Sequence, residues 1–328
     1  MEGKKYYFDV LRLLATFAVV VMHTSSAFGN LENSLSEADV FSYSMYHDIT
    51  TFAVPVFVMI SGALFLSPER DTSYPILISK YVRRIVLALI IFGLPMCLLE
   101  TFFSHESMAK AFLNLLLGRS WTHMWYLYML ICLYLLTPML KAFLQTESRR
   151  TVEFVLLVLF VLSSVLPMLV SYGVPIESWM IINKPFILYY ILGYYLLSIE
   201  QLPVSRIVCF ALFLVLPATV LVSLLGFLPA HEVLYADSFV VIGASALFLL
   251  FKRMNVRWST ATSCYPYCFA IYLVHPFFIN VACKFFHFDI TTFAPAWASV
   301  PLAAMVIFSL SFAVSWALRR IPFMRKVI

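Results

Sequence analysis

The sequence has few charged residues. Only 12% of its 328 residues are Asp, Glu, Lys or Arg, whereas soluble globular proteins carry about 25%. Apolar runs of about 20 residues, long enough to cross a bilayer, recur from one end of the chain to the other, and 62% of all residues are hydrophobic. These runs leave no room for a soluble domain of ordinary size. The composition therefore predicts an all-α polytopic membrane protein.

Paired cysteines and metal-ligand spacings are also missing. The chain has 6 cysteines but no CxxC pair and no Cys/His spacing typical of a metal site. Most of the cysteines lie within apolar runs, where cysteine commonly serves as a small hydrophobic residue. We therefore expect neither a metal site nor a disulfide framework.

Neither an internal repeat nor a low-complexity linker interrupts the chain, which predicts a single membrane-embedded domain over residues 1–328. The first apolar run, at 7–28, could imitate a signal peptide. It is too long for the apolar region of such a peptide, contains Asp9 and Arg12, and lacks a small-residue cleavage site. This run is therefore predicted to be a retained first helix.

Hydropathy predicts about ten transmembrane helices. They lie near residues 7–28, 49–67, 79–101, 124–143, 152–172, 183–198, 204–227, 236–251, 264–286 and 295–318. The segment at 107–118 places apolar residues at helical spacing over too short a length to span a bilayer. It predicts a short helix that lies in the membrane interface.

Lysine and arginine fall mostly on one side of the predicted helices, and this asymmetry sets the orientation. With a cytoplasmic N-terminus, the cytoplasmic segments carry Lys4, Lys5, Arg70, Lys80, Arg83, Arg84, Lys141, Arg149, Arg150, Arg206, Lys252, Arg253, Arg257, Arg319, Arg320, Arg325 and Lys326. The outer segments then carry only Lys110, Arg119, Lys184 and Lys284, and the first outer loop is acidic. We therefore predict that both termini are cytoplasmic. The same asymmetry accounts for the net charge of +5 without nucleic-acid binding.

The first predicted helix carries the ionisable residues Asp9, Arg12 and His23. A charge near the membrane centre costs ~2.5–3.5 kcal/mol on insertion scales, so such groups are functional candidates. Arg12 and His23 lie close to three helical turns apart, on nearly the same face, with ~16 Å between them along the axis. In a structural interpretation, Arg12 reaches lipid phosphates and pairs with Asp9, and His23 is inert. In a functional interpretation, this face presents a fixed cation near the inner surface and a titratable base deeper in the membrane.

Three more cations, Lys80, Arg83 and Arg84, lie at the start of the third predicted helix. The positive-inside rule alone would place cations there. Their helical spacing would also allow a pocket for an anionic cofactor.

Two further histidines can likewise be interpreted as structural or as functional residues. His123 begins the fourth predicted helix, and His275 precedes Pro276 in the ninth. His275 is either a functional residue or a core histidine bonded to a carbonyl that the proline leaves free.

Four segments together resemble the acyltransferase 3 family of membrane O-acyltransferases, especially members that O-acetylate bacterial surface polysaccharides. They are FDVLRLLATFAVVVMH (8–23), VPVFVMISGALF (54–65), HMWYLYMLICLYLLTPML (123–140) and AIYLVHP (270–276). The likeness is strongest over 6–140 and 264–280 and weak over 145–260. Arg12 and His23 occur at the family's arginine–histidine spacing, and Ser61 belongs to its second-helix signature. The family's arginine pair at the third helix is altered, because Lys80 replaces the first arginine and Arg83 retains the second.

The resemblance implies transfer of an acetyl group from cytoplasmic acetyl-CoA to a hydroxyl of a surface or lipid-linked saccharide, at the bacterial inner membrane. Arg12, Lys80, Arg83 and Arg84 would hold the CoA phosphates. His23 would act as general base or as an acyl-accepting nucleophile. The second-tier candidates, for orienting the acceptor or polarising the thioester, are His123, His275, Asp9 and Ser61.

Two other classes of protein would share these helices. A polysaccharide or lipid-linked saccharide exporter would more often contain two related halves or interrupted helix pairs, and the sequence displays neither. A non-catalytic assembly subunit would tolerate loss of His23. Dependence on acetyl-CoA separates the enzyme from the exporter.

Overall fold

The computed structural model describes residues 5–29, 35–95, 97–98, 101, 107–118, 122–182, 184–199, 204–228, 233–254 and 256–328. The structure is 80% helical, and no strand occurs within these ranges. The all-α prediction is therefore confirmed. Lys4, Arg119 and the side chain of Lys284, which entered the prediction of orientation, lie outside the described part.

Seven helical segments of the described chain are long and apolar enough to cross a membrane. They are Tyr6–Gly29, Glu37–Phe65, Trp125–Thr146, Arg149–Ser171, Arg206–Leu224, Ser259–Cys283 and Ala296–Leu318. Their outer faces expose large apolar side chains such as Phe154, Ile207 and Leu302, as contact with lipid requires. The protein is a multi-pass membrane protein.

Several of these segments are built from shorter helices joined end to end. The helices are α1 (Tyr6–Gly29), α2 (Glu37–Ile49), α3 (Ala53–Phe65), α8 (Trp125–Thr146), α9 (Arg149–Phe160), α10 (Leu166–Ser171), α12 (Arg206–Phe213), α13 (Val215–Leu224), α15 (Ser259–Cys264), α16 (Cys268–Asn280) and α17 (Ala296–Leu318). Short 3₁₀ or π-helical turns connect α9 to α10 and α15 to α16.

The other predicted spans are helical as well but shorter or incompletely described. α11 (Phe186–Ser198) has 13 residues and α14 (Ser238–Met254) has 17. The helix of the span predicted at 79–101 begins earlier, with α4 (Tyr74–Ile76). It continues through a π-helical segment, α5 (Arg83–Ala88) and a second π-helical segment, and the end of the span passes beyond the described residues. The count of about ten spans and the cytoplasmic position of both termini stay predictions.

The second span begins earlier than its hydropathy predicted. The acidic segment expected to be an outer loop forms α2, which starts at Glu37. The Ser36 hydroxyl accepts a hydrogen bond from the Asp39 backbone N–H and so caps the helix. A polar, capped helix gives no hydropathy signal, which explains the difference.

The short helix predicted at 107–118 is present as α7 (Met108–Leu116). Its apolar residues Met108, Phe112 and Leu116 are exposed on one helix, as an interfacial helix requires. The secondary structure of this segment is confirmed, and its position in the interface stays a prediction.

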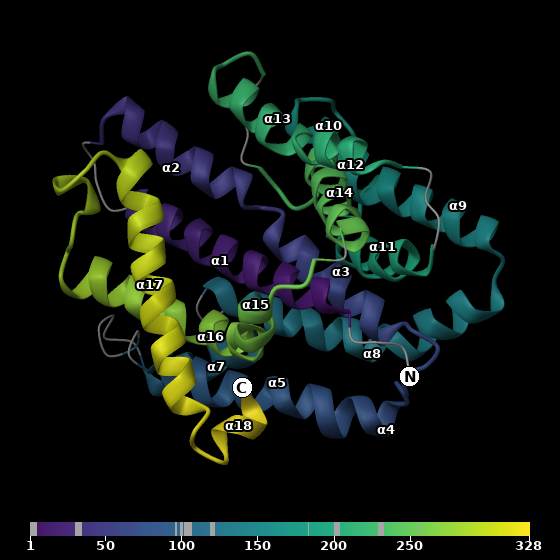
Figure 1. The fold of residues 1–328 in the computed structure, drawn as a ribbon, viewed down its shortest axis with the longest axis horizontal. Helices are drawn as coiled ribbons and strands as arrows, with labels where there is room; N and C mark the ends of the chain where they lie inside the picture. The colour runs from purple at the N-terminus through teal and green to yellow at the C-terminus, as the bar shows by residue number, and fades with distance from the viewer. Residues whose placement is uncertain are drawn as a thin grey trace.

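Helix α1 lies at the centre of the fold (Figure 1) and packs against α2, α3, α16 and α17. Its buried residues include Leu11, Ala15 and Val20. This central position explains why a helix with ionisable residues is stable in a membrane. Its polar groups face other helices instead of lipid.

Helices α3 and α11 cross with their backbones in direct contact. A Cβ added to Gly62 would lie 1.8 Å from the carbonyl oxygen of Tyr190, and one added to Gly193 would lie 2.0 Å from that of Met59. Only glycine allows so close an approach at either position. The crossing fixes the wall of the molecule that carries Ser61.

The start of the third predicted helix departs from α-helical geometry. Residues Leu77–Val82 and Leu89–Gly93 are π-helical, on either side of α5. Since π-helical hydrogen bonds join residues i and i+5, the faces of this helix differ from those that α-helical spacing predicts.

The end of the described chain packs against α5. Helix α18 (Met324–Val327) lies beside α5 in Figure 1. Arg84 Nε donates a hydrogen bond to the Val327 carbonyl at 2.8 Å, and Arg319 Nη1 donates to the Ile328 backbone oxygen at 2.9 Å.

Candidate active site

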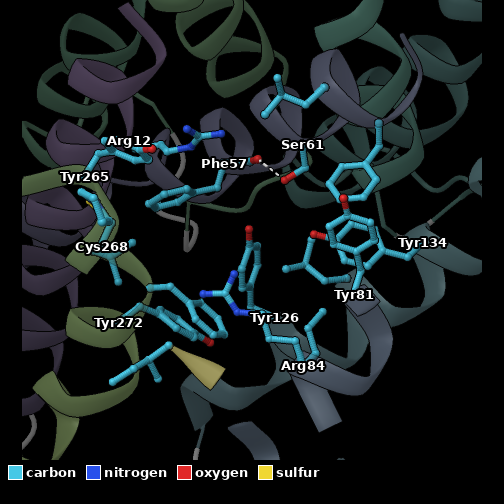
Figure 2. Close-up of a pocket in the computed structure, with 18 of the residues that line it drawn as sticks. Arg12, Phe57, Ser61, Tyr81, Arg84, Tyr126, Tyr134, Tyr265, Cys268 and Tyr272 are labelled. Atoms are coloured by element: carbon cyan, nitrogen blue, oxygen red, sulfur yellow. Dashed lines mark hydrogen bonds between the residues drawn. The ribbon is translucent and has the colours of Figure 1, made fainter. Parts of the chain in front are cut away.

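A cavity of about 500 Å³ lies between α1, α3, α5, α8 and α16. One stripe of side chains from each helix lines it (Figure 2). The stripe on α8 consists of Tyr126, Leu130 and Tyr134, which follow one another at four-residue spacing along one face. The cavity therefore runs along the helix axes, over a length of ~12 Å on α8.

Five arginines line this cavity: Arg12, Arg70, Arg84, Arg319 and Arg325. Arg12 Nη1 lies 3.7 Å from Asp9 Oδ1, so Asp9 neutralises part of the buried charge. The Arg84 guanidinium extends into the centre of the cavity in Figure 2. With few anionic side chains among the lining residues, the cavity has the charge that an anionic ligand needs.

Aromatic rings support several of these arginines. The guanidinium of Arg70 lies 4.1 Å from the ring centroid of Phe65, and that of Arg84 lies 5.2 Å from the centroid of Phe269. Arg70 Nη2 also donates to the Tyr81 hydroxyl at 2.7 Å. Such cation–π contacts hold a guanidinium in place while its remaining N–H groups can bind a ligand.

The structure brings together some of the cations that the sequence singled out and not others. Arg12 and Arg84 both line the cavity, and so does Ser61, whose hydroxyl donates to the Phe57 carbonyl at 2.9 Å. Lys80 and Arg83 are not part of the lining. Both side chains are exposed.

No pattern in the sequence marks Arg70, Arg319 or Arg325 as site residues. They belong to three segments outside the long helices, and only the positive-inside asymmetry drew attention to them. No local spacing could have assigned them to one cavity.

Three histidines from three different helical segments meet beyond one end of the cavity. His23 lies on α1, His123 in the turn η3 (Thr122–Met124) before α8, and His275 on α16. The ring centroids of His23 and His275 are 5.1 Å apart, and those of His123 and His275 are 5.8 Å apart. His123 and His275 are buried, whereas His23 is partly exposed. We call these residues the histidine cluster.

Hydrogen bonds indicate which ring nitrogens of His23 and His275 carry a proton. His275 Nδ1 lies 3.1 Å from the Ile271 carbonyl oxygen, which only accepts, so Nδ1 carries the proton. His275 Nε2 of the neutral ring is then an acceptor, and His23 Nδ1 donates to it at 2.9 Å. In this arrangement His23 Nε2 carries a lone pair. His23 therefore presents a base, and His275 fixes its tautomer.

The cavity and the histidine cluster are adjacent layers of the same helices. Val19, Tyr126 and Tyr272 line the cavity, and each lies three or four residues from a histidine of the cluster. Tyr272 also donates a hydrogen bond from its hydroxyl to the His123 carbonyl. An anionic ligand bound by the arginines would thus have its far end one helical turn from His23.

No group of His, Cys, Asp or Glu side chains in the described ranges is arranged to hold a metal ion. The chemistry available to these residues is proton transfer or nucleophilic attack by an imidazole next to a cationic cavity.

Comparison with known proteins agrees with this chemistry. The family described as "Acyltransferase domain", the acyltransferase 3 family, matches residues 5–320, which is nearly the whole chain. Searches of curated proteins and of solved structures gave no match. The resemblance seen in the four sequence segments is therefore confirmed over almost the full length. The protein belongs to the acyltransferase 3 family and is an acyltransferase.

Proposed function

We propose that the protein is an O-acetyltransferase of the bacterial inner membrane. It moves an acetyl group from cytoplasmic acetyl-CoA to a hydroxyl of a surface or lipid-linked saccharide. The observation that carries this proposal is a base, His23 Nε2, one helical turn beyond a cavity lined by five arginines. The arginines suit an anionic donor, and the base suits a hydroxyl acceptor.

The donor binds with its phosphates at the arginine end of the cavity. Charge-assisted hydrogen bonds from Arg12, Arg84 and Arg319 hold the phosphates, and Arg70 and Arg325 add positive charge. The pantetheine arm then follows α1 from Arg12 toward His23, a rise of ~16 Å. The thioester reaches the level of the histidine cluster.

The acceptor approaches His23 from the side away from the cavity. His23 is partly exposed and does not line the cavity, which supports approach of the acceptor from a side other than the donor's. With cytoplasmic termini, this side is the outer one. A lipid-linked saccharide could reach it there without meeting the donor's phosphates.

The reaction then has two routes that use the same nitrogen. In the first, His23 Nε2 takes the proton of the acceptor hydroxyl while the oxygen of that hydroxyl attacks the thioester carbonyl. The carbon–sulfur bond breaks, and the CoA thiolate receives the proton from His23. In the second, His23 Nε2 attacks the thioester carbonyl, and the carbon–sulfur bond breaks to release the CoA thiolate. The acceptor oxygen then attacks the acyl-imidazole, the carbon–nitrogen bond to His23 breaks, and the acceptor's proton passes to the thiolate. His275 holds the His23 tautomer in both.

The decisive experiment measures transfer of radiolabelled acetyl from acetyl-CoA into surface glycan by membranes that contain the protein. Label in the glycan supports an acetyltransferase. Absence of label with a competent acceptor present would contradict the proposal and would favour a different acyl donor.

Arg84→Ala is expected to raise KM for acetyl-CoA about tenfold, because a charge-assisted hydrogen bond contributes ~1.5–3 kcal/mol. Arg83→Ala is the matched control, since Arg83 is adjacent in sequence but outside the lining. Steady-state kinetics at varied acetyl-CoA measure both. An equal rise in both variants would instead support the sequence prediction that Lys80 and Arg83 also hold the donor.

His275→Leu is expected to lower kcat on the order of 10–100-fold with little change in KM for acetyl-CoA, because His23 loses the acceptor that fixes its ring. His275→Gln retains an acceptor oxygen at a similar position and should recover part of the loss. Measurement of kcat and KM separately tests this positioning role. Equal loss in the Leu and Gln variants would mean that packing alone matters at this position.

A further inference from the structure

The cavity ends in a layer of three side chains that separates it from the histidine cluster. On α1, Val19 precedes His23 by four residues, and on α16, Tyr272 precedes His275 by three. On α8, which runs the opposite way, Tyr126 follows His123 by three residues. On all three segments the residue that lines the cavity thus lies one helical turn from the histidine, on the cavity side. Val19, Tyr126 and Tyr272 therefore lie at the same level of the three helices.

This layer is closely packed. The ring centroids of Tyr126 and Tyr272 are 5.5 Å apart in an edge-to-face arrangement. The Tyr272 hydroxyl is bonded to the His123 carbonyl, which fixes its ring. The Tyr126 ring also contacts Phe57 on α3, with centroids 6.3 Å apart. Val19 on α1 is buried. The two tyrosine rings narrow the end of the cavity nearest to His23.

We propose that Val19, Tyr126 and Tyr272 form an acyl-size filter that admits an acetyl group to His23 and rejects longer acyl chains. The inference rests on the proposed function, because it assumes a thioester donor in the cavity. The thioester carbonyl must pass this layer to reach His23 Nε2, and the acyl chain must occupy the space beside the rings. Each added methylene has to displace packed side chains, and one methylene in such a site changes kcat/KM by about 10–200-fold.

Tyr126 is the member of the layer whose replacement opens the filter most. Tyr272 anchors the His123 backbone, so its loss would disturb the cluster as well. Tyr126 makes ring contacts with Phe57 and Tyr272, and its truncation leaves a space next to both. Val19 is smaller, and Val19→Ala removes two methyl groups with little risk to folding.

The experiment compares kcat/KM for acetyl-, propionyl-, butyryl- and hexanoyl-CoA in membranes that contain wild type, Tyr126→Ala or Val19→Ala at matched abundance. Wild type should prefer acetyl over butyryl by at least about tenfold. Tyr126→Ala should reduce this preference by about tenfold or more, and Val19→Ala should reduce it to a smaller extent. Leu130→Ala is the control, because Leu130 lines the same cavity one turn from Tyr126 on the arginine side.

The outcomes separate this inference from the proposed function. Unchanged acyl preference in both Tyr126→Ala and Val19→Ala, with active wild type, would overturn the filter and leave the acetyltransferase intact. Equal transfer of acetyl and butyryl groups by wild type would also overturn the filter and leave the acetyltransferase intact. Failure of wild type to use acetyl-CoA would overturn the proposed function, and the filter with it. An equal change of acyl preference in Leu130→Ala would mean that the whole cavity, and not this layer alone, selects the length of the acyl chain.

Discussion

His23→Ala is expected to reduce acyl transfer by about 10²–10⁴-fold, the usual contribution of a general base. If His23 is instead the acyl-accepting nucleophile, the loss reaches or exceeds the upper end of this range. In either case, the loss follows from the lone pair that the hydrogen bond to His275 leaves on His23 Nε2. Incorporation of labelled acetyl into glycan, normalised to membrane abundance, measures it.

Thr24→Ala provides the matched control for this substitution. Thr24 is the next residue on α1, is buried, and donates its hydroxyl to the Val20 carbonyl of the same helix at 2.7 Å. Its loss tests whether packing at this level of α1 matters for transfer. Wild-type activity in His23→Ala would contradict the assignment of His23. Equal loss in both variants would attribute the effect to packing.

Gly62→Ala is expected to remove most of the folded protein from the membrane. The added methyl group would lie 1.8 Å from the Tyr190 carbonyl oxygen, which belongs to a backbone and not to a flexible side chain. Overpacking in a core typically costs about 1–3 kcal/mol, and more where no rotamer can adjust. Gly193→Ala should lower membrane abundance in the same way, because its added methyl group would lie 2.0 Å from the Met59 carbonyl oxygen. Membrane abundance and thermal stability in detergent measure the effect.

Ser61→Ala is the control for Gly62→Ala, because Ser61 is adjacent and donates its hydroxyl to the Phe57 carbonyl of its own helix. It should leave membrane abundance unchanged, since alanine is a better helix former than serine. Normal abundance of Gly62→Ala would mean that α3 and α11 separate at little cost, and the close crossing would then not determine the fold.

Much of the fold and part of the site could be predicted from the sequence. The apolar runs predicted helices that the structure contains, because hydropathy reports directly on lipid-facing surface. Arg12 was selected because it lies on the same α-helical face as His23, and it lines the cavity. His123 and His275 were named as secondary candidates, and the structure places both beside His23.

The rest depended on contacts that no local pattern encodes. Arg70 and Arg319 enter the cavity from segments that are distant in sequence, and only the packing of α5, α8 and α16 brings them together. Lys80 lies outside the lining although Arg84 and Tyr81 belong to it, and no local pattern in the sequence separates these neighbours. The role of Gly62 required knowledge of its neighbour, Tyr190.

The crossing of α3 and α11 also determines which wall of the cavity is stiff. Two backbones in contact have no torsion angles that could adjust their separation, so the wall carrying Ser61 resists deformation. The opposite wall is held by long arginine side chains, with Arg84 and Arg319 bonded to the backbone at Val327 and Ile328. Side chains of this length rotate on the picosecond-to-nanosecond timescale where they are exposed. We therefore expect the cavity to change shape more easily at α5 and α18 than at the wall formed by α3.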